Sequence, residues 1–269
     1  MRGQCGAIFS KVDVRDYQMI CAAQNVEFPA EFEFKTVRIK DQGQIGRCVA
    51  TALSSIIEYY NNKQNGDDTE MSPGYIYGNR GNSEHKGPGM IMRDALDVVT
   101  KFGDVTSDEF PYDMEAPEII KYYDRHSKRL FASGHPHRIS EYCRVNTIGA
   151  AKMALMAGVP LLMAMEWYED MEVDDSGVLT TNYVGYAGGH CMFIYGWDER
   201  GWKIQNSWSE DWGVGGCFVL PYEMGMAECW AVMDDIVEGT YIKKPFQSKF
   251  GKAFAKVVNA VCNVFYNGK

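Results

Sequence analysis

The fold is decided at Asp41-Gln42-Gly43-Gln44-Ile45-Gly46-Arg47-Cys48, a short glycine-containing stretch that leads into an apolar segment. Beyond it, apolar residues recur with helical spacing, which predicts a helix over about 48–62 with one buried face. The two glycines disfavour helix before Cys48, so this residue is expected in the first turn. Unpaired backbone N–H groups and the positive end of the helix dipole at that position favour a thiolate, the nucleophilic form of cysteine.

A second motif begins at Gly188-Gly189-His190 and continues as an apolar run to Trp197. A polar turn separates this run from residues 202–208, which predicts two strands joined as a hairpin. His190 begins one strand and Asn206 lies near the end of the other, so we expect the two side chains to meet. Cysteine, histidine and asparagine are the residue types of a nucleophile, a general acid–base and a group that orients it.

Together these motifs resemble the papain-like, C1-type family of cysteine peptidases. Gln42 precedes Cys48 by six residues in D-Q-G-x-x-G-x-C, and Asn206 follows His190 by 16 residues inside N-S-W-x-x-x-W-G-x-x-G. Three flanking segments resemble the compact, prokaryote-type branch that lacks a long prodomain: 14–17, 71–77 and 102–113. The resemblance covers roughly residues 13–238. It implies a two-lobe α+β fold, with an α-helical left lobe, a β-barrel-like right lobe and the active-site cleft between them.

The resemblance also implies a role for each residue of the motifs. Cys48 attacks the scissile carbonyl as a thiolate, and His190 holds the proton and then delivers it to the leaving amine. Asn206 orients the imidazole ring. The Gln42 side chain and the backbone N–H of Cys48 bind the oxyanion. Trp208 shields the bond between His190 and Asn206 from water.

Substrate-binding residues are expected from both lobes. Gly89 offers its backbone to an extended substrate, and Cys191 with Met90 and Ile91 forms an apolar pocket for the second side chain before the cut. The full set assigned to substrate binding is Gly89, Met90, Ile91, Gly189, Cys191 and Trp208. Arg47 stands where relatives usually carry serine, and three roles are compatible with it: lowering the pKa of Cys48, binding an acidic substrate group, or facing solvent.

Four segments are expected along the chain. Residues 1–40 form an N-terminal segment that packs on the catalytic domain, and 41–120 form the α-rich lobe with the nucleophile helix. Residues 121–238 form the β-rich lobe with His190 and Asn206, and 239–269 form a basic amphipathic tail. Helices are expected at 90–102 and 146–158, strands at 161–165 and 216–220, and a charged connector at 121–128. Forty residues are too few for the family's usual inhibitory prosegment, so we expect an enzyme without that prodomain or one controlled in another way.

Charge is unevenly distributed along the chain. All 36 acidic residues and 21 basic ones precede Gly239, so this body carries a formal charge of −15, and six lysines follow it. The acidic body argues against nucleic-acid binding, and it either serves solubility or favours cationic substrates. In the tail, residues 246–265 place aromatic and aliphatic side chains on one helical face and lysines on the other. This segment either packs on the acidic body, docks on a membrane surface or in a partner's groove, or acts as a removable inhibitory tail.

The eight cysteines show no metal-type pairing, and we expect no metal and no cofactor. Secreted papain relatives place a disulfide-forming cysteine three residues before the nucleophile, but Ile45 occupies that position here. The first 30 residues lack the pattern of a signal peptide, and no apolar run approaches the length of a membrane span. Reduced thiols and a cytoplasmic location are therefore expected.

The leading hypothesis is a cysteine endopeptidase that hydrolyses peptide bonds through a Cys-His-Asn triad and a thioester acyl-enzyme. One alternative keeps the triad but acts as an amidase or transpeptidase on a specific partner. Another is a non-catalytic peptide-binding module. The joint presence of Gln42, Cys48, His190 and Asn206 argues against the last alternative, because binding alone does not require all four.

Overall fold

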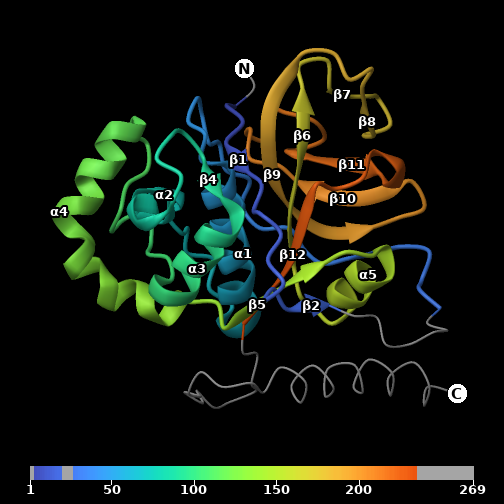
Figure 1. The fold of residues 1–269 in the computed structure, drawn as a ribbon. Helices are drawn as coiled ribbons and strands as arrows, with labels where there is room; N and C mark the ends of the chain where they lie inside the picture. The colour runs from blue at the N-terminus through green and yellow to red at the C-terminus, as the bar shows by residue number, and fades with distance from the viewer. Residues whose placement is uncertain (1–2, 20–26, 235–269) are drawn as a thin grey trace, which may run out of the picture.

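The computed structural model describes residues 3–19 and 27–234 (Figure 1). Helices gather on one side of a central helix, and a large sheet with a short helix lies on the other side. The α+β fold class is therefore confirmed. The basic tail expected at 239–269 lies outside the described residues.

The central helix α1 spans Cys48–Asn65 and ends where Gly66 adopts a left-handed conformation with φ of 66°. Its first residue is Cys48, as the glycine-containing stretch predicts. The expectation of a single buried face is wrong, because every residue from Cys48 to Asn61 is buried. Helices cover α1 from one lobe and the sheet covers it from the other, so no face is left to solvent.

Three further helices form the helical lobe. Helix α2 (Pro73–Gly78) begins with Ser72 as its side-chain cap and proline in the first position. Helix α3 (Met92–Phe102) starts two residues later than expected, because strand β4 (Met90–Ile91) comes directly before it. This short strand matters for function, since its backbone faces the space between the lobes.

Helix α4 spans Ala116–Gly134, so the prediction of a connector at 121–128 is wrong. A capping box formed by Glu115 and Glu118 starts the helix. Of its apolar side chains, Ile119 and Leu130 are buried while most of the helix surface is polar. The prediction failed because a surface helix with so few buried residues has almost the same pattern of charged residues as a solvent-exposed linker.

The strand-rich lobe is built on an eight-stranded sheet. In the order of hydrogen-bonded neighbours its strands are β11 (Cys217–Pro221), β10 (Gly201–Gln205), β9 (Tyr186–Trp197), β6 (Leu161–Tyr168), β12 (Glu228–Met233), β5 (Glu141–Val145) and β2 (Gln18–Met19), with β3 (Phe32–Glu33) paired to β9. The four strands expected in this lobe are all present, whereas β5 and β12 were not predicted. Helix α5 (Ile148–Met156) covers the sheet and is capped by Thr147.

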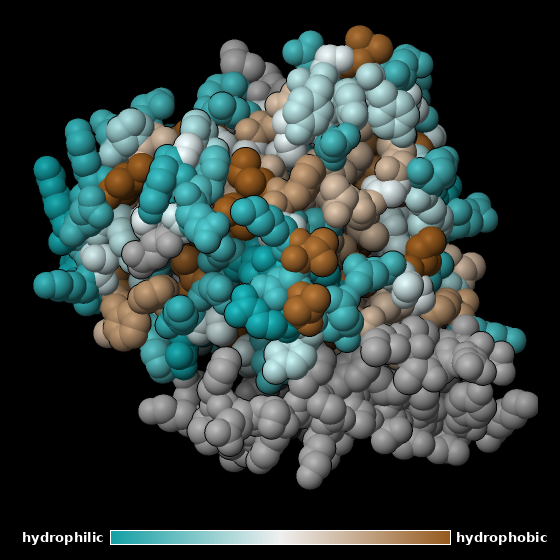
Figure 2. Space-filling view, in the orientation of Figure 1, coloured by the Kyte–Doolittle hydropathy of each residue, from teal (hydrophilic) through white to brown (hydrophobic). Residues whose placement is uncertain are grey.

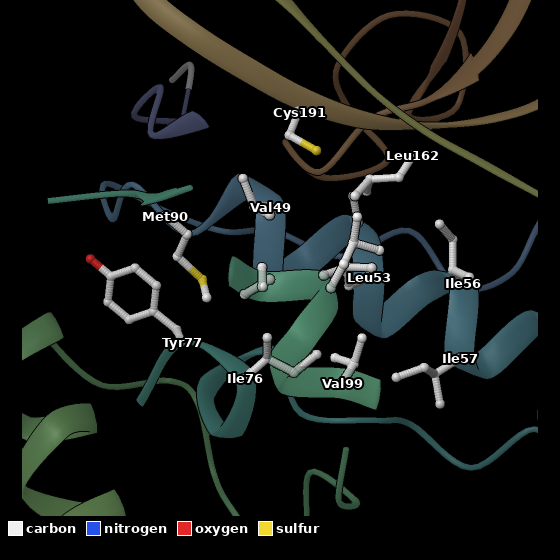
Figure 3. Close-up of a cluster of buried hydrophobic side chains, with 14 of the residues drawn as sticks. Val49, Leu53, Ile56, Ile57, Ile76, Tyr77, Met90, Val99, Leu162 and Cys191 are labelled. Carbon is white, nitrogen blue, oxygen red and sulfur yellow. The ribbon is translucent and has the colours of Figure 1, made fainter. Parts of the chain in front are cut away.

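Alternation along β9 and β6 divides the core between the two lobes. Cys191 and Phe193 belong to the cluster around α1, whereas Met192 and Ile194 belong to the cluster on the other face of the sheet. Figure 3 shows Cys191 and Leu162, both from the sheet, above the residues of α1. The register of β9 on α1 therefore fixes where His190 stands relative to the start of the helix.

The remaining elements are short. They are β1 (Ala7–Ile8), β7 (Glu172–Val173), β8 (Leu179–Thr180) and the 3-10 helices at Asn79–Asn82, His135–His137 and Tyr222–Met224. Strand β1 pairs in parallel with β4 of the helical lobe, while β2 pairs with β5 of the strand-rich lobe. The N-terminal segment is thus bonded to both lobes.

A buried ion pair joins the stretch before Cys48 to α1. Lys40 pairs with Glu58, their side chains are 0% and 5% exposed, and Glu58 also accepts a hydrogen bond from the Met71 backbone at 2.7 Å. Burial raises the pKa of Glu58, and the Lys40 ammonium opposes that rise. The pair holds residue 40 against the middle of α1, one residue before the motif that carries Gln42.

We predict that Lys40→Met will destabilise the fold by about 3–5 kcal/mol, because it leaves the Glu58 carboxylate buried without its counter-charge. Urea denaturation followed by circular dichroism measures the change in the free energy of unfolding. Arg15→Met removes the exposed pair with Asp13 and is the control, for which we expect no measurable change. Equal midpoints for the two variants would show that the buried pair does not stabilise this junction.

Candidate active site

His190 and Asn206 meet as the hairpin predicts. His190 lies in β9 and Asn206 follows the end of β10, and His190 Nε2 is 2.7 Å from Asn206 Oδ1. The Ser207 backbone N–H donates to the same Oδ1 at 2.8 Å, which identifies that atom as an oxygen acceptor. His190 Nε2 is therefore the protonated nitrogen of the neutral ring, and Nδ1 is free to accept a proton. No other described residue hydrogen-bonds Nδ1.

Cys48 is brought to the strand that carries His190 by the packing of α1 on β9. Its thiol is completely buried, and the backbone N–H groups of Cys191, Gly6 and Val49 are directed at the sulfur. Cys191 is the residue after His190 in β9, so the sulfur lies against the backbone that carries the imidazole. The first turn of α1 supplies the N–H of Val49, as expected for a residue at a helix start.

The amide of Gln42 is oriented by three hydrogen bonds. Its Oε1 accepts from Ser207 Oγ at 2.7 Å, and its Nε2 donates to the Ile45 carbonyl at 2.9 Å and to the Gln4 carbonyl at 2.6 Å. Ser207 and Ile45 fix the orientation of the amide, so that the second N–H of Nε2 points towards the N-terminal segment. That N–H meets a carbonyl oxygen of the N-terminal segment. Gln42 is thus placed to bind a carbonyl oxygen, which is the role expected for it.

An aromatic wall covers the imidazole. Trp208 stacks on His190 with ring centroids 4.4 Å apart and an interplanar angle of 24°. Trp167 meets His190 edge-on at 5.2 Å and Trp208 at 4.9 Å. Trp167 was not predicted to belong to the site, because it lies in β6 far from the motifs and reaches them only by pairing beside Gly188 of β9.

Residues 3–10 of the N-terminal segment occupy the space between the lobes. The Gly6 N–H donates to the Gly189 carbonyl at 3.0 Å, and the Met90 N–H donates to the Gly6 carbonyl at 2.9 Å. These two bonds join the strand-rich lobe and the helical lobe through one residue. The backbone groups expected to bind a substrate are therefore engaged by the chain itself, and of the two expectations for residues 1–40 this arrangement favours control in a way other than a long prodomain.

Glycine is required at position 6. A Cβ there would overlap the backbone of Gly46, and Gly89 faces the Gly6 carbonyl with an equally close approach and φ of 95°. Cys5, the preceding residue, lies with its Cβ 3.1 Å from the position a Cβ would take at Gly188. The segment fits the cleft because the three residues whose backbones touch, Gly6, Gly46 and Gly89, have no side chains.

Ion pairs anchor the segment beyond the cleft. Asp16 binds Arg93 of α3 at 2.5 Å and Arg144 of β5 at 3.1 Å. Burial alone would raise the pKa of Asp16, but the hydrogen bonds from both arginines outweigh burial and lower it. Nearer the cleft, the Ser10 N–H donates to the buried Glu228 carboxylate of β12 at 2.7 Å. The position of Asp16 in Val14-Arg15-Asp16-Tyr17 is the only sequence feature that pointed to this anchor.

The electrostatics of the covered site differ from the expectation of a lowered thiol pKa. Burial raises the pKa of Cys48 to about 11, although the backbone N–H groups around the sulfur act in the opposite direction. Burial likewise lowers the pKa of His190 to about 4, against the effect of its bond to Asn206. With the segment in place, both groups are neutral at pH 7. The helix position of Cys48 is as expected, but dehydration dominates its titration.

Arg47 is buried rather than solvent-facing, which excludes one of its three roles. Its Nη1 donates to the Tyr112 carbonyl at 2.5 Å, and its guanidinium lies 5.1 Å from the centroid of the Tyr112 ring. It therefore ties the start of α1 to the loop before α4. Cys191 and Met90 are also buried, and with Gly89, Ile91, Gly189 and Trp208 they stay predictions as substrate-binding residues.

Within the described residues, no group of three or more His, Cys, Asp or Glu side chains is arranged to hold a metal ion. No helix in the part of the chain that the structure describes combines the length and the apolar character needed to span a bilayer.

Comparison with known proteins identifies the family. The family described as papain family cysteine protease matches residues 28–234. The chain belongs to the papain family of cysteine proteases. The crystal structure of xylellain, a cysteine protease from Xylella fastidiosa, is 25% identical and superimposes with a TM-score of 0.71 over 87% of this chain and 98% of that one. The papain-like fold is therefore shown, in agreement with the resemblance of the motifs.

Curated papain-family relatives match over smaller parts of their length. An uncharacterized peptidase C1-like protein of Acanthamoeba polyphaga mimivirus is 25% identical over 68% of this chain and 64% of its own. A cathepsin B-like cysteine proteinase of Caenorhabditis elegans is 35% identical over 34% of this chain and 24% of its own. The chain thus spans less than two thirds of these relatives.

We predict that Gly6→Ala will displace the segment from the cleft and speed alkylation of Cys48 by iodoacetamide at least tenfold. The added Cβ has no room against Gly46, so the segment cannot seat. Peptide mapping by mass spectrometry gives the rate at Cys48. Gly81→Ala is the matched control, because a Cβ there meets nothing within 4 Å. An unchanged rate in Gly6→Ala would mean that the segment does not limit access to the thiol.

We also predict that acidification opens the cleft. We call the state with residues 3–10 in the cleft the covered state. In it the pKa of His190 is about 4, below the ordinary value of 6.5, so His190 takes up a proton less readily than in an uncovered state. Lowering the pH through 6.5 therefore destabilises the covered state, by about tenfold in the covering equilibrium at pH 5.5. Amide hydrogen exchange of Gly6 and Met90, corrected for intrinsic rates, measures this loss of protection. The loss should be absent in His190→Gln, and equal losses in both proteins would contradict the assignment.

Proposed function

We propose that this protein is a cysteine endopeptidase that uses Cys48, His190, Asn206 and Gln42. The observation that carries the proposal is the bond between His190 Nε2 and Asn206 Oδ1, which leaves Nδ1 as a proton acceptor one residue from Cys191, whose backbone N–H is directed at the Cys48 sulfur. A general base with a fixed tautomer next to a helix-start thiol is the arrangement that nucleophilic catalysis requires.

The chemical steps follow from these positions. His190 Nδ1 takes the thiol proton, and the sulfur of Cys48 attacks the carbonyl carbon of the substrate. The oxyanion binds Gln42 Nε2 and the backbone N–H of Cys48. His190 then gives its proton to the leaving amine, which departs and leaves a thioester. A water molecule, deprotonated by His190, attacks the thioester, releases the carboxylic acid and restores the thiol.

Passage of a chain through the cleft supports endopeptidase activity. Residues 3–10 run past Cys48 without a break, with Gly3 against Trp208 at one end and Ser10 bonded to Glu228 at the other. The cleft therefore accommodates extended backbone on both sides of the nucleophile. An exopeptidase site needs a wall that stops the chain on one side of the nucleophile, so this uninterrupted path favours an endopeptidase.

The direction of the bound segment explains why it is not a substrate. The leaving amine must depart on the side walled by Trp208, because that ring stacks on the imidazole that protonates it. A productive substrate therefore runs from Met90 towards Trp208. The segment runs the other way, from Gly3 at Trp208 to strand β1 beside β4. Its carbonyl at Gln4 fills the place of the oxyanion, but the nitrogen of that bond leads away from Trp208. The enzyme is thus latent until the segment withdraws.

The test combines labelling with turnover of a fluorogenic peptide, in protein carrying Gly6→Ala so that the cleft is uncovered. We predict that an epoxide-type thiol-protease inhibitor labels this protein once, that adding Cys48→Ala abolishes labelling, and that adding Cys217→Ala, which removes another free cysteine, leaves it unchanged. Gln42→Ala should lower kcat about 100- to 1,000-fold through loss of one oxyanion donor. Intact-mass analysis and fluorogenic peptide cleavage give the two readouts. Labelling that survives in Cys48→Ala would overturn the assignment of the nucleophile.

A further inference from the structure

An exposed aromatic patch lies on the strand-rich lobe, outside the site described above. It consists of Tyr168, Tyr183, Val184 and Tyr186, and we call it the tyrosine patch. Tyr183, Val184 and Tyr186 are 53%, 62% and 60% exposed, so three large apolar side chains within four residues face solvent. Figure 2 shows a pale surface with a strongly hydrophobic spot at the upper right of the molecule, where Figure 1 places the upper ends of β6 and β9. Exposed apolar residues are common singly, but a contiguous set often marks an interaction surface.

The tyrosine patch is held in a defined arrangement. The rings of Tyr183 and Tyr186 both pack edge-on against Tyr168, with centroids 5.4 and 5.8 Å away. Tyr183 has φ of 61°, a backbone conformation that tyrosine rarely adopts. The Asp170 carboxylate stabilises this loop by accepting bonds from the backbone N–H groups of Asn182 at 2.6 Å and Val184 at 3.0 Å. The side chains therefore stay exposed because the loop is fixed, and little ordering is required when a partner binds.

The patch continues the side of the cleft where the leaving amine departs. Trp167, Glu169 and Ala187 line a cavity of about 410 Å³, and Gly3 and Trp208 also line it. Tyr168 follows Trp167 in β6, and Tyr186 precedes Ala187 in β9. Tyr186 is four residues from His190 along β9, which corresponds to about 13 Å of extended strand. An extended substrate reaches that distance at roughly the fourth residue after the cut.

The stretch that carries the patch is acidic. Residues 166–186 contain six acidic residues and no lysine or arginine. They are Glu166, Glu169, Asp170, Glu172, Asp174 and Asp175, and Arg200 approaches this stretch at the turn of residues 174–176, where it donates to the Ser176 carbonyl at 2.9 Å. Glu166 accepts the Tyr168 hydroxyl at 2.9 Å, so one carboxylate lies directly beside the rings. Tyrosine faces together with carboxylates bind guanidinium and ammonium groups through cation–π contact and Coulomb attraction.

We propose that the tyrosine patch binds the part of a protein substrate that follows the scissile bond, and that it selects a segment with arginine or lysine beside an apolar residue about three to five positions after the cut. The inference rests on the proposed function, because the leaving-group side of the cleft sets the direction of the substrate. It adds a recognition surface that none of the motifs includes. The patch acts as a second contact that lengthens the time a substrate stays in the cleft.

Three quenched-fluorescence peptides test the proposal on the full chain carrying Gly6→Ala, the variant that uncovers the cleft and serves as the reference for every rate below. They share one sequence through the second residue after the cut, and then either stop, continue as Gly-Arg-Leu-Arg, or continue as Gly-Glu-Leu-Glu. We expect kcat/KM to be about tenfold higher for the arginine extension than for the short peptide, mainly through KM, with no gain for the glutamate extension. The gain should shrink as ionic strength rises, because the attraction is partly electrostatic.

The double variant Tyr183→Ser, Tyr186→Ser should lose the gain while cleaving the short peptide at the reference rate. Phe131→Ser removes an exposed aromatic side chain of α4 in the helical lobe and is the matched control, for which the gain should persist. Turnover of the short peptide with no effect of the arginine extension would overturn the proposal and leave the proposed function standing.

Binding separates the two proposals completely. In Cys48→Ser, fluorescence anisotropy with labelled Gly-Arg-Leu-Arg measures affinity for the patch without turnover. Binding that disappears in the tyrosine double variant supports the proposed role of the patch. This holds even if no peptide is cleaved and no inhibitor labels Cys48, because those two results would contradict only the proposed protease function. Equal affinity with and without the two tyrosines would overturn the inference.

Discussion

The contact between the start of α1 and strand β9 is the interaction on which the rest of this structure depends. It places the Cys48 thiol against the backbone of Cys191, one residue from the imidazole of His190. The two elements come from different lobes, so the site exists only while the lobes remain packed. Full burial of Cys48 to Asn61 makes α1 the common core of both halves, and its apolar contacts are the main force that keeps them together.

Covering the cleft changes what this contact can do. Burial disfavours the charged forms of a thiol and an imidazole, and here both side chains are completely buried, with Gly6 of the N-terminal segment lying against the sulfur. The pKa values of Cys48 and His190 move in opposite directions, and both move towards the neutral form. The segment therefore blocks the cleft and also suppresses the ionisation that makes the sulfur reactive. One short stretch of backbone achieves both effects because Gly6 reaches both lobes at once.

Acidic charge has more than one role in this protein. Asp16 and Glu228 are buried and paired, and they hold the N-terminal segment against the arginines and backbone of both lobes. The carboxylates of residues 166–175 lie instead in and beside the loops around the tyrosine patch, and residues 166–186 themselves contain no lysine or arginine. The same residue types thus fix the covered state at one end of the cleft and attract cationic partners at the other. The two sets of carboxylates differ in their surroundings: Asp16 and Glu228 face arginines, whereas those near the tyrosine patch lie in an acidic stretch.

The sequence by itself determined the helix at Cys48, the hairpin that joins His190 to Asn206, and membership of the family, because each depends on local spacing within a few tens of residues. Helix α4 and strands β5 and β12 escaped prediction, since their short or narrow buried patterns acquire meaning only against neighbouring elements. The occupied cleft, the place of Trp167 beside His190 and the burial of Arg47 were decided by tertiary structure alone. Each of these brings together residues more than 20 positions apart in the chain, and no periodicity in a sequence records such a contact. The titration of Cys48 belongs with them, because water exclusion depends on what covers a side chain and not on the element that carries it.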